Sequence, residues 1–200
     1  MSDPRAIVRI FGDIVSAVSD NILSTIQANE LALAQEVIPD MAVSNIEQIN
    51  YQFGHLKELI TTMKEWESAP DYRTKKYPLV ALLMDFPERN GDNGGYYSEV
   101  TLQVLIAYVT EPTFKAEERY TKVFEPILLP IYYELLNQIE ASAEFVTKGV
   151  RFIKHTKIDH PFYGKGGLSD TAGNVFADTV DAIEVQNLVL TTNIPKCYIN

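Results

Sequence analysis

The chain has 200 residues, 46% of them hydrophobic and 22% charged, and its 17 Lys and Arg against 27 Asp and Glu give a formal net charge of −10. This length fits one domain with a packed core, and the composition excludes wholesale disorder. The excess negative charge repels phosphate, so it disfavours binding of nucleic acid over a broad face and attachment to an anionic membrane.

The single cysteine, Cys197, lies near the C-terminus, which excludes an internal disulfide and a cysteine-based zinc site. A chain with a single cysteine is typical of proteins made in a reducing cytosol, so we expect synthesis there. The longest apolar stretch, Val100 to Val109, is shorter than the roughly 20 residues of a transmembrane helix. The first residues lack the basic and apolar blocks of a signal peptide, so we expect synthesis in the cytoplasm without secretion.

The N-terminal part of the chain is predicted to be mainly helical. Apolar residues at steps of three or four predict an amphipathic helix from Pro4 to about Ala28, with Asp3 as its N-cap. Residues 46–51 are predicted as a short strand or extended piece, and residues 55–66 as a second, short helix.

Two strands are predicted in the middle of the chain. Residues 77–86 are nearly all apolar, which is typical of a strand covered on both faces. Residues 100–109 alternate with the two-residue period of a long strand. Because the connecting residues 90–95 are rich in Gly and Asn, an antiparallel hairpin is the simplest arrangement.

A long helical region follows the hairpin. Residues 113–142 keep the apolar period of a helix, but Pro126 and Pro130 cannot donate to its backbone hydrogen bonds, so we expect two helices or one kinked helix. From about 148 to 180 the period is weak, and we predict an extended contact loop.

The last predicted element is a strand over residues 182–191, with a bulge or a change of burial near Asn187. The order of elements predicts a single α+β domain over residues 1–200. Its sheet is expected to be small and mostly antiparallel, to contain a β-hairpin, and to be backed by the N-terminal helix and a long, proline-kinked helix.

The candidates for chemistry are few. His155 and His160 form the only histidine cluster, but zinc needs a third and usually a fourth ligand, and no other residue is fixed near them by spacing. The Gly-rich residues 164–167 lack the spacing and the Ser or Thr of a phosphate-binding loop. We therefore predict no catalytic residue, no cofactor and no metal. A metal-dependent hydrolase or metal-binding module using His155 and His160 is the alternative.

Several segments resemble, in their order and spacing, the tail-terminator and head-tail connector ring proteins of tailed bacteriophages, particularly crAss-like and other Bacteroidetes phages. The segments are 76–83 (KYPLVALL), 100–108, 118–120 (ERY), 126–132 (PILLPIY), 162–164 (FYG), 173–174 (GN) and 178–184 (DTVDAIE). The resemblance implies a small α+β virion subunit without enzymatic activity, made in the host cytoplasm. Such a subunit forms a closed homo-oligomeric ring.

The resemblance also implies partners. They are further copies of the chain, adjacent portal, connector or tail ring proteins, and DNA that passes through the lumen without specific binding; no membrane is involved. Asp and Glu are expected on the inner wall. An exposed strand edge and aromatic side chains predict the subunit contacts, which are Val100, Leu102, Val104, Tyr132, Tyr133, Phe162 and Tyr163. Basic residues expected near contacts are Lys75, Lys76, Lys154, Lys157 and Lys165.

Overall fold

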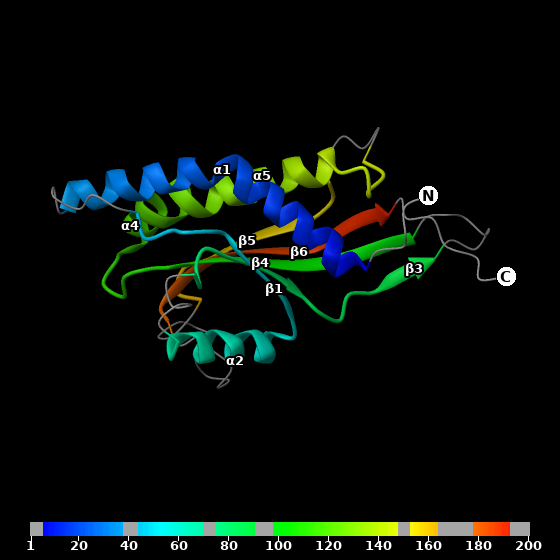
Figure 1. Cartoon of the computed structure of the whole chain (residues 1–200), viewed down its shortest axis with the longest axis horizontal. Helices are drawn as coiled ribbons and strands as arrows, with labels where there is room; N and C mark the ends of the chain where they lie inside the picture. The colour runs from blue at the N-terminus through cyan, green and yellow to red at the C-terminus, as the bar shows by residue number, and fades with distance from the viewer. Residues whose placement is uncertain are drawn as a thin grey trace.

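The computed structural model, which describes residues 6–37, 44–69, 75–90, 98–147, 153–163 and 178–192, contains one six-stranded mixed sheet with helices on both faces (Figure 1). The strands are β1 Asn50–Gly54, β2 Leu79–Leu83, β3 Glu88–Asn90, β4 Ser98–Val109, β5 Thr156–His160 and β6 Val180–Thr192. The helices are α1 Ile7–Val37, α2 Leu56–Glu67, α4 Ala116–Arg119, the π-helix η1 Tyr120–Leu128 and α5 Leu129–Ala141. The predicted α+β class is confirmed.

The helices form two layers. α1 and α5 lie side by side on one face of the sheet, and α2 lies on the other (Figure 1). Helix α2 falls where its apolar period predicts it, and it buries Leu59, Ile60 and Met63. Helix α1 runs to Val37, beyond the predicted end near Ala28. The predicted N-cap, Asp3, is outside the described residues.

The strand order is β1-β2-β4-β6-β5, with β3 also paired to β4. Only β1 and β2 are parallel; the other pairs are antiparallel. The predicted hairpin is present, since β2 pairs with β4 from Leu79↔Ala107 to Leu83↔Gln103. Its first arm is interrupted after β2, where Asp85 has a φ of 73°, and resumes as β3.

Strand β4 lies between two neighbours, so the exposed edge expected for it is wrong. It pairs with β2 and β3 on one side and with β6 on the other. Val100, Leu102 and Val104 are at most 1% exposed and belong to the core of the subunit. The alternation of apolar and polar residues identifies a strand with one buried face. It does not tell whether the chain's own helices or another subunit cover that face.

The predicted irregularity near Asn187 is a β-bulge. Register changes between the pairs Leu102↔Leu188 and Val104↔Val185, so Gln186 and Asn187 together oppose one residue of β4. Asn187 has a φ of 53°, a left-handed conformation that Asn tolerates better than most residues. The bulge bends β6 at this level.

The proline-containing helical run is continuous but changes form. Residues 120–128, which include Pro126, are π-helical, and the N–H of Leu129 donates to the carbonyl of Phe124, five residues earlier. Pro130 has no N–H for the carbonyl of Pro126; Asn29 Nδ2 of α1 donates to that oxygen instead, at 2.8 Å. A side chain of the packed helix thus satisfies the group that the proline leaves free.

Residues 148–180 are not one loop, because residues 156–160 within them form strand β5. Residues 148–152 and 164–177, the Gly-rich tip at 91–97 and Cys197 are outside the described residues. The strand was not apparent from the sequence because its residues are only partly buried or exposed, so they show no apolar alternation.

Candidate interface at the β5 edge

Most of the residues predicted as contacts or metal ligands gather around one end of the sheet. β5 follows His155 and contains His160, and a turn at Phe162 and Tyr163 follows the strand. β5 pairs with β6 from Thr156↔Gln186 to His160↔Ala182, and no other strand of the described chain pairs with its outer side. We name this side of the molecule the β5 edge.

On the helix side of β5, His155 ties the strand to α5. Its Nδ1 lies 2.7 Å from the carbonyl oxygen of Ile153, and its Nε2 lies 2.6 Å from the Tyr132 hydroxyl. Because a carbonyl only accepts, Nδ1 carries the proton, and in the neutral ring Nε2 accepts from Tyr132. Tyr132 is 6% exposed, and its burial raises the pKa of its phenol, as do the nearby Tyr133 and Asp159. The prediction of Tyr132 as a subunit contact is therefore wrong: it packs within the chain.

Two tyrosine rings remain at the surface beside this strand. Tyr133 is 59% exposed and meets the Tyr132 ring edge-on, with centroids 5.1 Å apart. Tyr120 is 38% exposed, stacks on Phe124 at 4.7 Å, and places its hydroxyl 3.5 Å from Asp159 of β5. Tyr133 stays a predicted contact. Tyr120 was not predicted as a contact, because its place in the apolar period of residues 113–142 gives no sign of exposure.

On the opposite face, Glu184 of β6 collects three polar side chains. His160 Nε2 lies 2.8 Å from one carboxylate oxygen. Gln186 Nε2 donates to the other oxygen at 2.9 Å, and Gln103 Nε2 also donates to that oxygen. Burial of Glu184 favours its neutral form, but the hydrogen bonds from Gln186, His160 and Gln103 outweigh burial, so the pKa of Glu184 is lowered. His160, Gln186 and Gln103 thus hold the ionised Glu184 carboxylate on the face of the sheet opposite Tyr132.

This carboxylate makes a pH-dependent contribution to stability. In the folded chain the pKa of Glu184 lies below its ordinary value of 4.5, so the ionised form stabilises the fold above that pH and ceases to do so as the pH falls through the folded-state pKa. Glu184→Gln is expected to lower the free energy of unfolding at neutral pH by about 1.5–3 kcal/mol, the worth of a hydrogen bond to a charged group. The difference in free energy of unfolding between Glu184→Gln and the unaltered chain should become smaller at acid pH.

Urea unfolding of both chains across a pH series measures this effect. Glu99→Gln, which changes an exposed carboxylate of β4, is the control and should follow the unaltered chain at every pH. A Glu184→Gln deficit that stays constant from neutral to acid pH would contradict the assignment.

The two histidines do not form one site. His155 and His160 are five residues apart on an extended chain, so their side chains point to opposite faces, toward Tyr132 and Glu184 respectively. Among the described residues, no group of three or more His, Cys, Asp or Glu side chains could hold a metal ion. His155 instead fastens β5 to helix α5 through Tyr132, and His160 fastens it to the neighbouring strand β6 through Glu184.

The turn after β5 is anchored by a buried ion pair. Arg119 and Asp181 side chains are fully buried, with Nη1 2.6 Å from Oδ1. The same Oδ1 accepts from the Phe162 N–H at 2.9 Å, and the Phe162 ring centroid lies 3.2 Å from the guanidinium carbon. Tyr163 donates its N–H to the Val180 carbonyl at 2.8 Å. Phe162 and Tyr163 thus have partners within their own chain, and both are less exposed than Tyr133.

Lys76 is also internal, so the expectation that it lies at a contact is wrong. It is 2% exposed and pairs with Glu67 at 2.5 Å and Asp178 at 2.6 Å. The Tyr77 hydroxyl donates to the same Asp178 oxygen at 3.1 Å. Lys76 therefore joins α2 to the start of β6.

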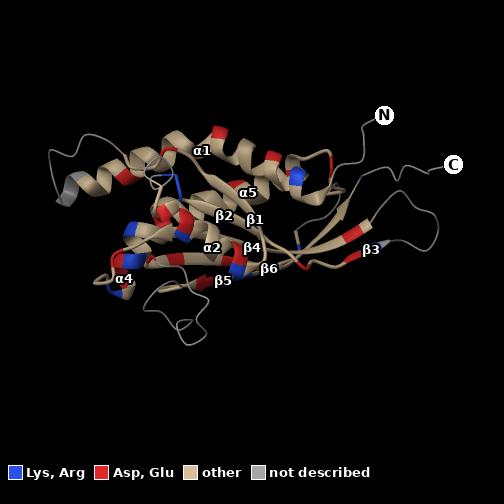
Figure 2. Ribbon diagram, turned by 60° about the horizontal axis from the view of Figure 1, so that its bottom comes forward, with Lys and Arg blue, Asp and Glu red and all other residues tan. Residues whose placement is uncertain are grey.

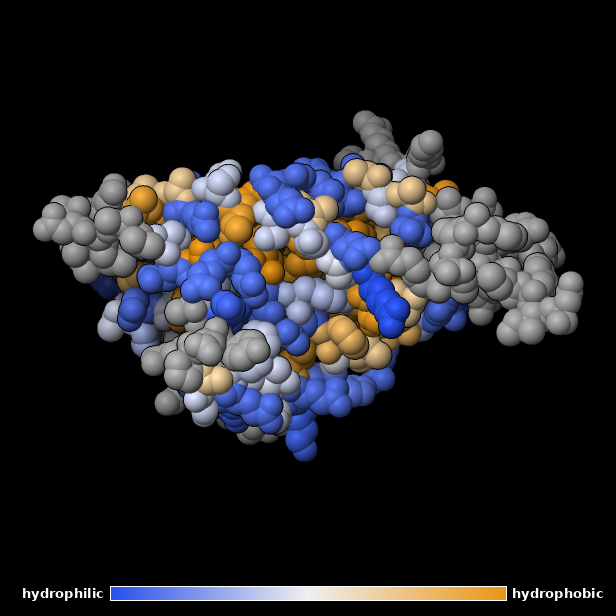
Figure 3. Space-filling model, viewed as in Figure 1, coloured by the Kyte–Doolittle hydropathy of each residue, from blue (hydrophilic) through white to orange (hydrophobic). Residues whose placement is uncertain are grey.

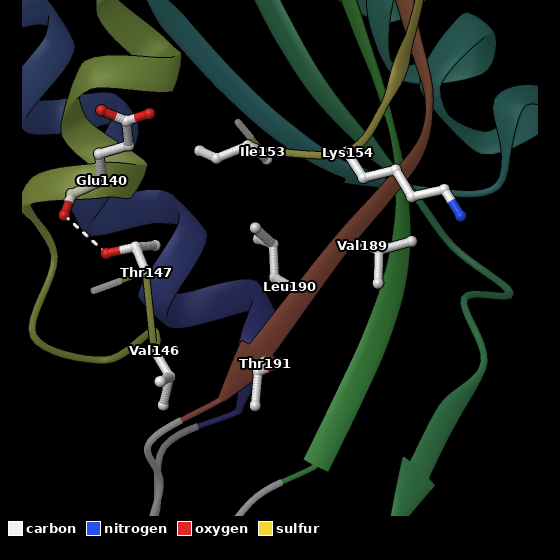
Figure 4. Close-up of a pocket in the computed structure, with 8 residues that line it drawn as sticks. All are labelled: Glu140, Val146, Thr147, Ile153, Lys154, Val189, Leu190 and Thr191. Atoms are coloured by element: carbon white, nitrogen blue, oxygen red, sulfur yellow. Dashed lines mark hydrogen bonds between the residues drawn. The ribbon is translucent and has the colours of Figure 1, made fainter. Parts of the chain in front are cut away.

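A hollow of about 200 Å³ lies between the end of α5 and β6 (Figure 4). Its walls are mainly aliphatic, and the Thr147 hydroxyl donates to the Glu140 carbonyl at 3.0 Å. The Lys154 amine points away from it (Figure 4). These side chains include no pairing of a nucleophile with a base, so they suggest no reaction.

Compared with family models, with curated proteins and with solved structures, the chain gives no match in any of the three. The resemblance to phage ring proteins therefore rests on the sequence segments given above. No helix of the described chain has both the length and the apolar character needed to cross a membrane.

Proposed function

We propose that this chain is a non-enzymatic virion protein, the subunit of a homo-oligomeric ring in the head-tail connector or tail terminator of a tailed phage. The observation that carries the proposal is that the sheet ends in two different edges, β1 and β5, on opposite sides of the subunit. A closed ring requires one patch of each subunit to meet a different patch of the next. In the part of the chain that the structure describes, one sheet with two unlike open edges supplies both patches.

The charge distribution supports the same role. Among residues with described side chains, α1 and α5 carry Asp13, Asp20, Glu30, Glu134 and Glu140, with Arg9 as their one basic residue. Figure 2 shows these acidic bands along the helix layer. A conduit for DNA needs a wall that repels phosphate. In the proposed ring, the α1 and α5 layer lines the lumen.

The metal-binding alternative has less support. It needs His155 and His160 in one coordination sphere, but each histidine serves a different face of β5. Without a shared position for the ion, the pair offers no ligand set for hydrolysis.

Mass photometry and negative-stain imaging of the purified chain test the proposal, together with antibody labelling of the particles. We expect closed rings with a central channel and label at the neck or tail. Tyr133→Arg should reduce assembly at least about tenfold, as loss of an interfacial tyrosine does, whereas Glu65→Arg on the exposed side of α2 should not. A chain that stays monomeric and never joins the particle contradicts the proposal.

A further inference from the structure

Strand β1 is an edge without the usual protection. It contains no charged residue and no proline, the features that normally prevent strand addition. The Asn50 N–H donates to Pro78 at 2.8 Å and the Gly54 carbonyl accepts from Met84 at 3.1 Å, so the backbone groups of Tyr51 and Phe53 point outward. The described chain supplies no hydrogen-bond partner for those groups.

The β1 edge also exposes apolar surface. Phe53 is 52% exposed, although its ring contacts Tyr51 with centroids 6.2 Å apart. Figures 1 and 3 view the molecule from this side, and Figure 3 shows apolar side chains at the surface between the helix layer and α2. An aromatic ring beside free backbone groups is a surface suited to a strand from another chain.

The directions of the strands make β5 a suitable partner. β1 is parallel to β2, and three successive antiparallel pairings lead from β2 to β5, so β1 and β5 run in opposite directions. Both strands are five residues long. Rotation about a ring axis that lies along the strands preserves their direction, so β5 of one copy meets β1 of the next as an antiparallel pair.

The side chains of β1 and β5 that would meet also lie on the same face of the sheet. The Tyr51 hydroxyl donates to the Val8 carbonyl of α1 at 2.8 Å, so Tyr51 and Phe53 lie on the helix side of the sheet. On β5, Lys157 and Asp159 lie on that side and pair with each other. The Lys157 amine lies over the Tyr132 ring, which contacts the exposed Tyr133 ring, and Asp159 meets the hydroxyl of the exposed Tyr120. A rotation that keeps the helix layers on one side brings Phe53 against the two exposed rings.

We infer that successive copies of this chain join by antiparallel pairing of β5 with β1, and that Phe53 of one copy packs on Tyr120 and Tyr133 of the next. The inference rests on the proposed ring and specifies its interface. A second copy is the occupant that fits, because the length, direction and face of each edge match those of the other edge on the same chain.

Engineered disulfides test this pairing in full-length protein carrying Cys197→Ser. Gln52→Cys, on the α2 side of β1, is combined in turn with Thr156→Cys, Ile158→Cys or His160→Cys, the β5 residues on the same side. At least one combination should give, on mild oxidation, a ladder of covalent multimers ending at the ring size, because cross-strand Cβ atoms lie within disulfide reach. Gln52→Cys with Lys157→Cys, on mismatched faces, and each single variant should give none.

Mass photometry of the same reduced samples separates the outcomes. Rings without a ladder in any of the three combinations overturn the β5–β1 pairing and leave the proposed function standing. Monomers throughout overturn both.

A second variant avoids cysteine altogether. Phe53→Lys should lower the ring fraction at least about tenfold, since it removes the aromatic ring that packs on Tyr120 and Tyr133 of the next copy, while Phe53→Tyr should retain it. Equal ring fractions for the two variants would also refute the packing of Phe53.

Discussion

Arg119→Ala is expected to lower the free energy of unfolding by about 3–5 kcal/mol, because it leaves Asp181 buried without its counter-charge. The loss extends beyond the ion pair, since Arg119 also donates to the carbonyls of Phe114 and Glu111, each at 3.0 Å. The second oxygen of Asp181 has no hydrogen-bond partner among the described residues, so this carboxylate depends heavily on the guanidinium. Urea unfolding at constant protein concentration measures the change.

Two further variants serve as controls for the Arg119→Ala measurement. Lys122→Ala removes the more exposed i,i+4 pair with Glu118 and should cost at most about 1 kcal/mol. Arg119→Met combined with Asp181→Leu should recover much of the stability, because apolar replacement of a whole buried pair is often tolerated. If Arg119→Ala costs no more than Lys122→Ala, the ion pair does not hold the turn after β5.

Phe124→Ala is expected to cost about 3–5 kcal/mol, because it opens a cavity in a packed core. Phe124 belongs to η1 and its side chain is fully buried in the core. Its ring stacks on the exposed Tyr120 ring and supports it. The variant should therefore also weaken assembly beyond its effect on stability. Thermal and urea unfolding, followed by mass photometry at a temperature where the variant is folded, measure the two effects separately.

Thr121→Ala is the matched control in the same π-helical segment. Thr121 is exposed and its hydroxyl donates to the Glu117 carbonyl at 3.0 Å, so its loss should change stability by less than about 0.5 kcal/mol. A Phe124→Ala variant as stable as Thr121→Ala would show that η1 is not packed as described.

The sequence predicts the elements whose side chains face a clearly apolar environment. The period of residues 55–66 locates α2, and the change of phase at Asn187 locates the bulge, because both signals depend on local alternation. Strand β5 is missed for the converse reason: at a sheet edge its side chains are partly buried or exposed, and no apolar period results.

The candidate interface is harder to predict, because it depends on strand order. Val104 and Tyr133 look equally suitable as contacts in the sequence, yet the first is in a central strand and the second is on the surface. Phe53 gives no sequence signal, since its exposure follows from the position of β1 at the end of the sheet. The hydrogen-bond partner of the Pro126 carbonyl, Asn29, is likewise distant in sequence, and the prolines alone do not reveal it.

Both neighbours of β4 are interrupted at the level of Gln103. On one side β2 ends at Leu83, which is paired with Gln103, and on the other side β6 bulges opposite the same residue. The two defects form a line across the sheet, between the part where β4 pairs with β2 and the part where it pairs with β3. In the proposed ring, we expect force from a neighbour to bend the sheet along this line, so that the subunit adjusts to what it contacts while the strand pairs on either side stay intact.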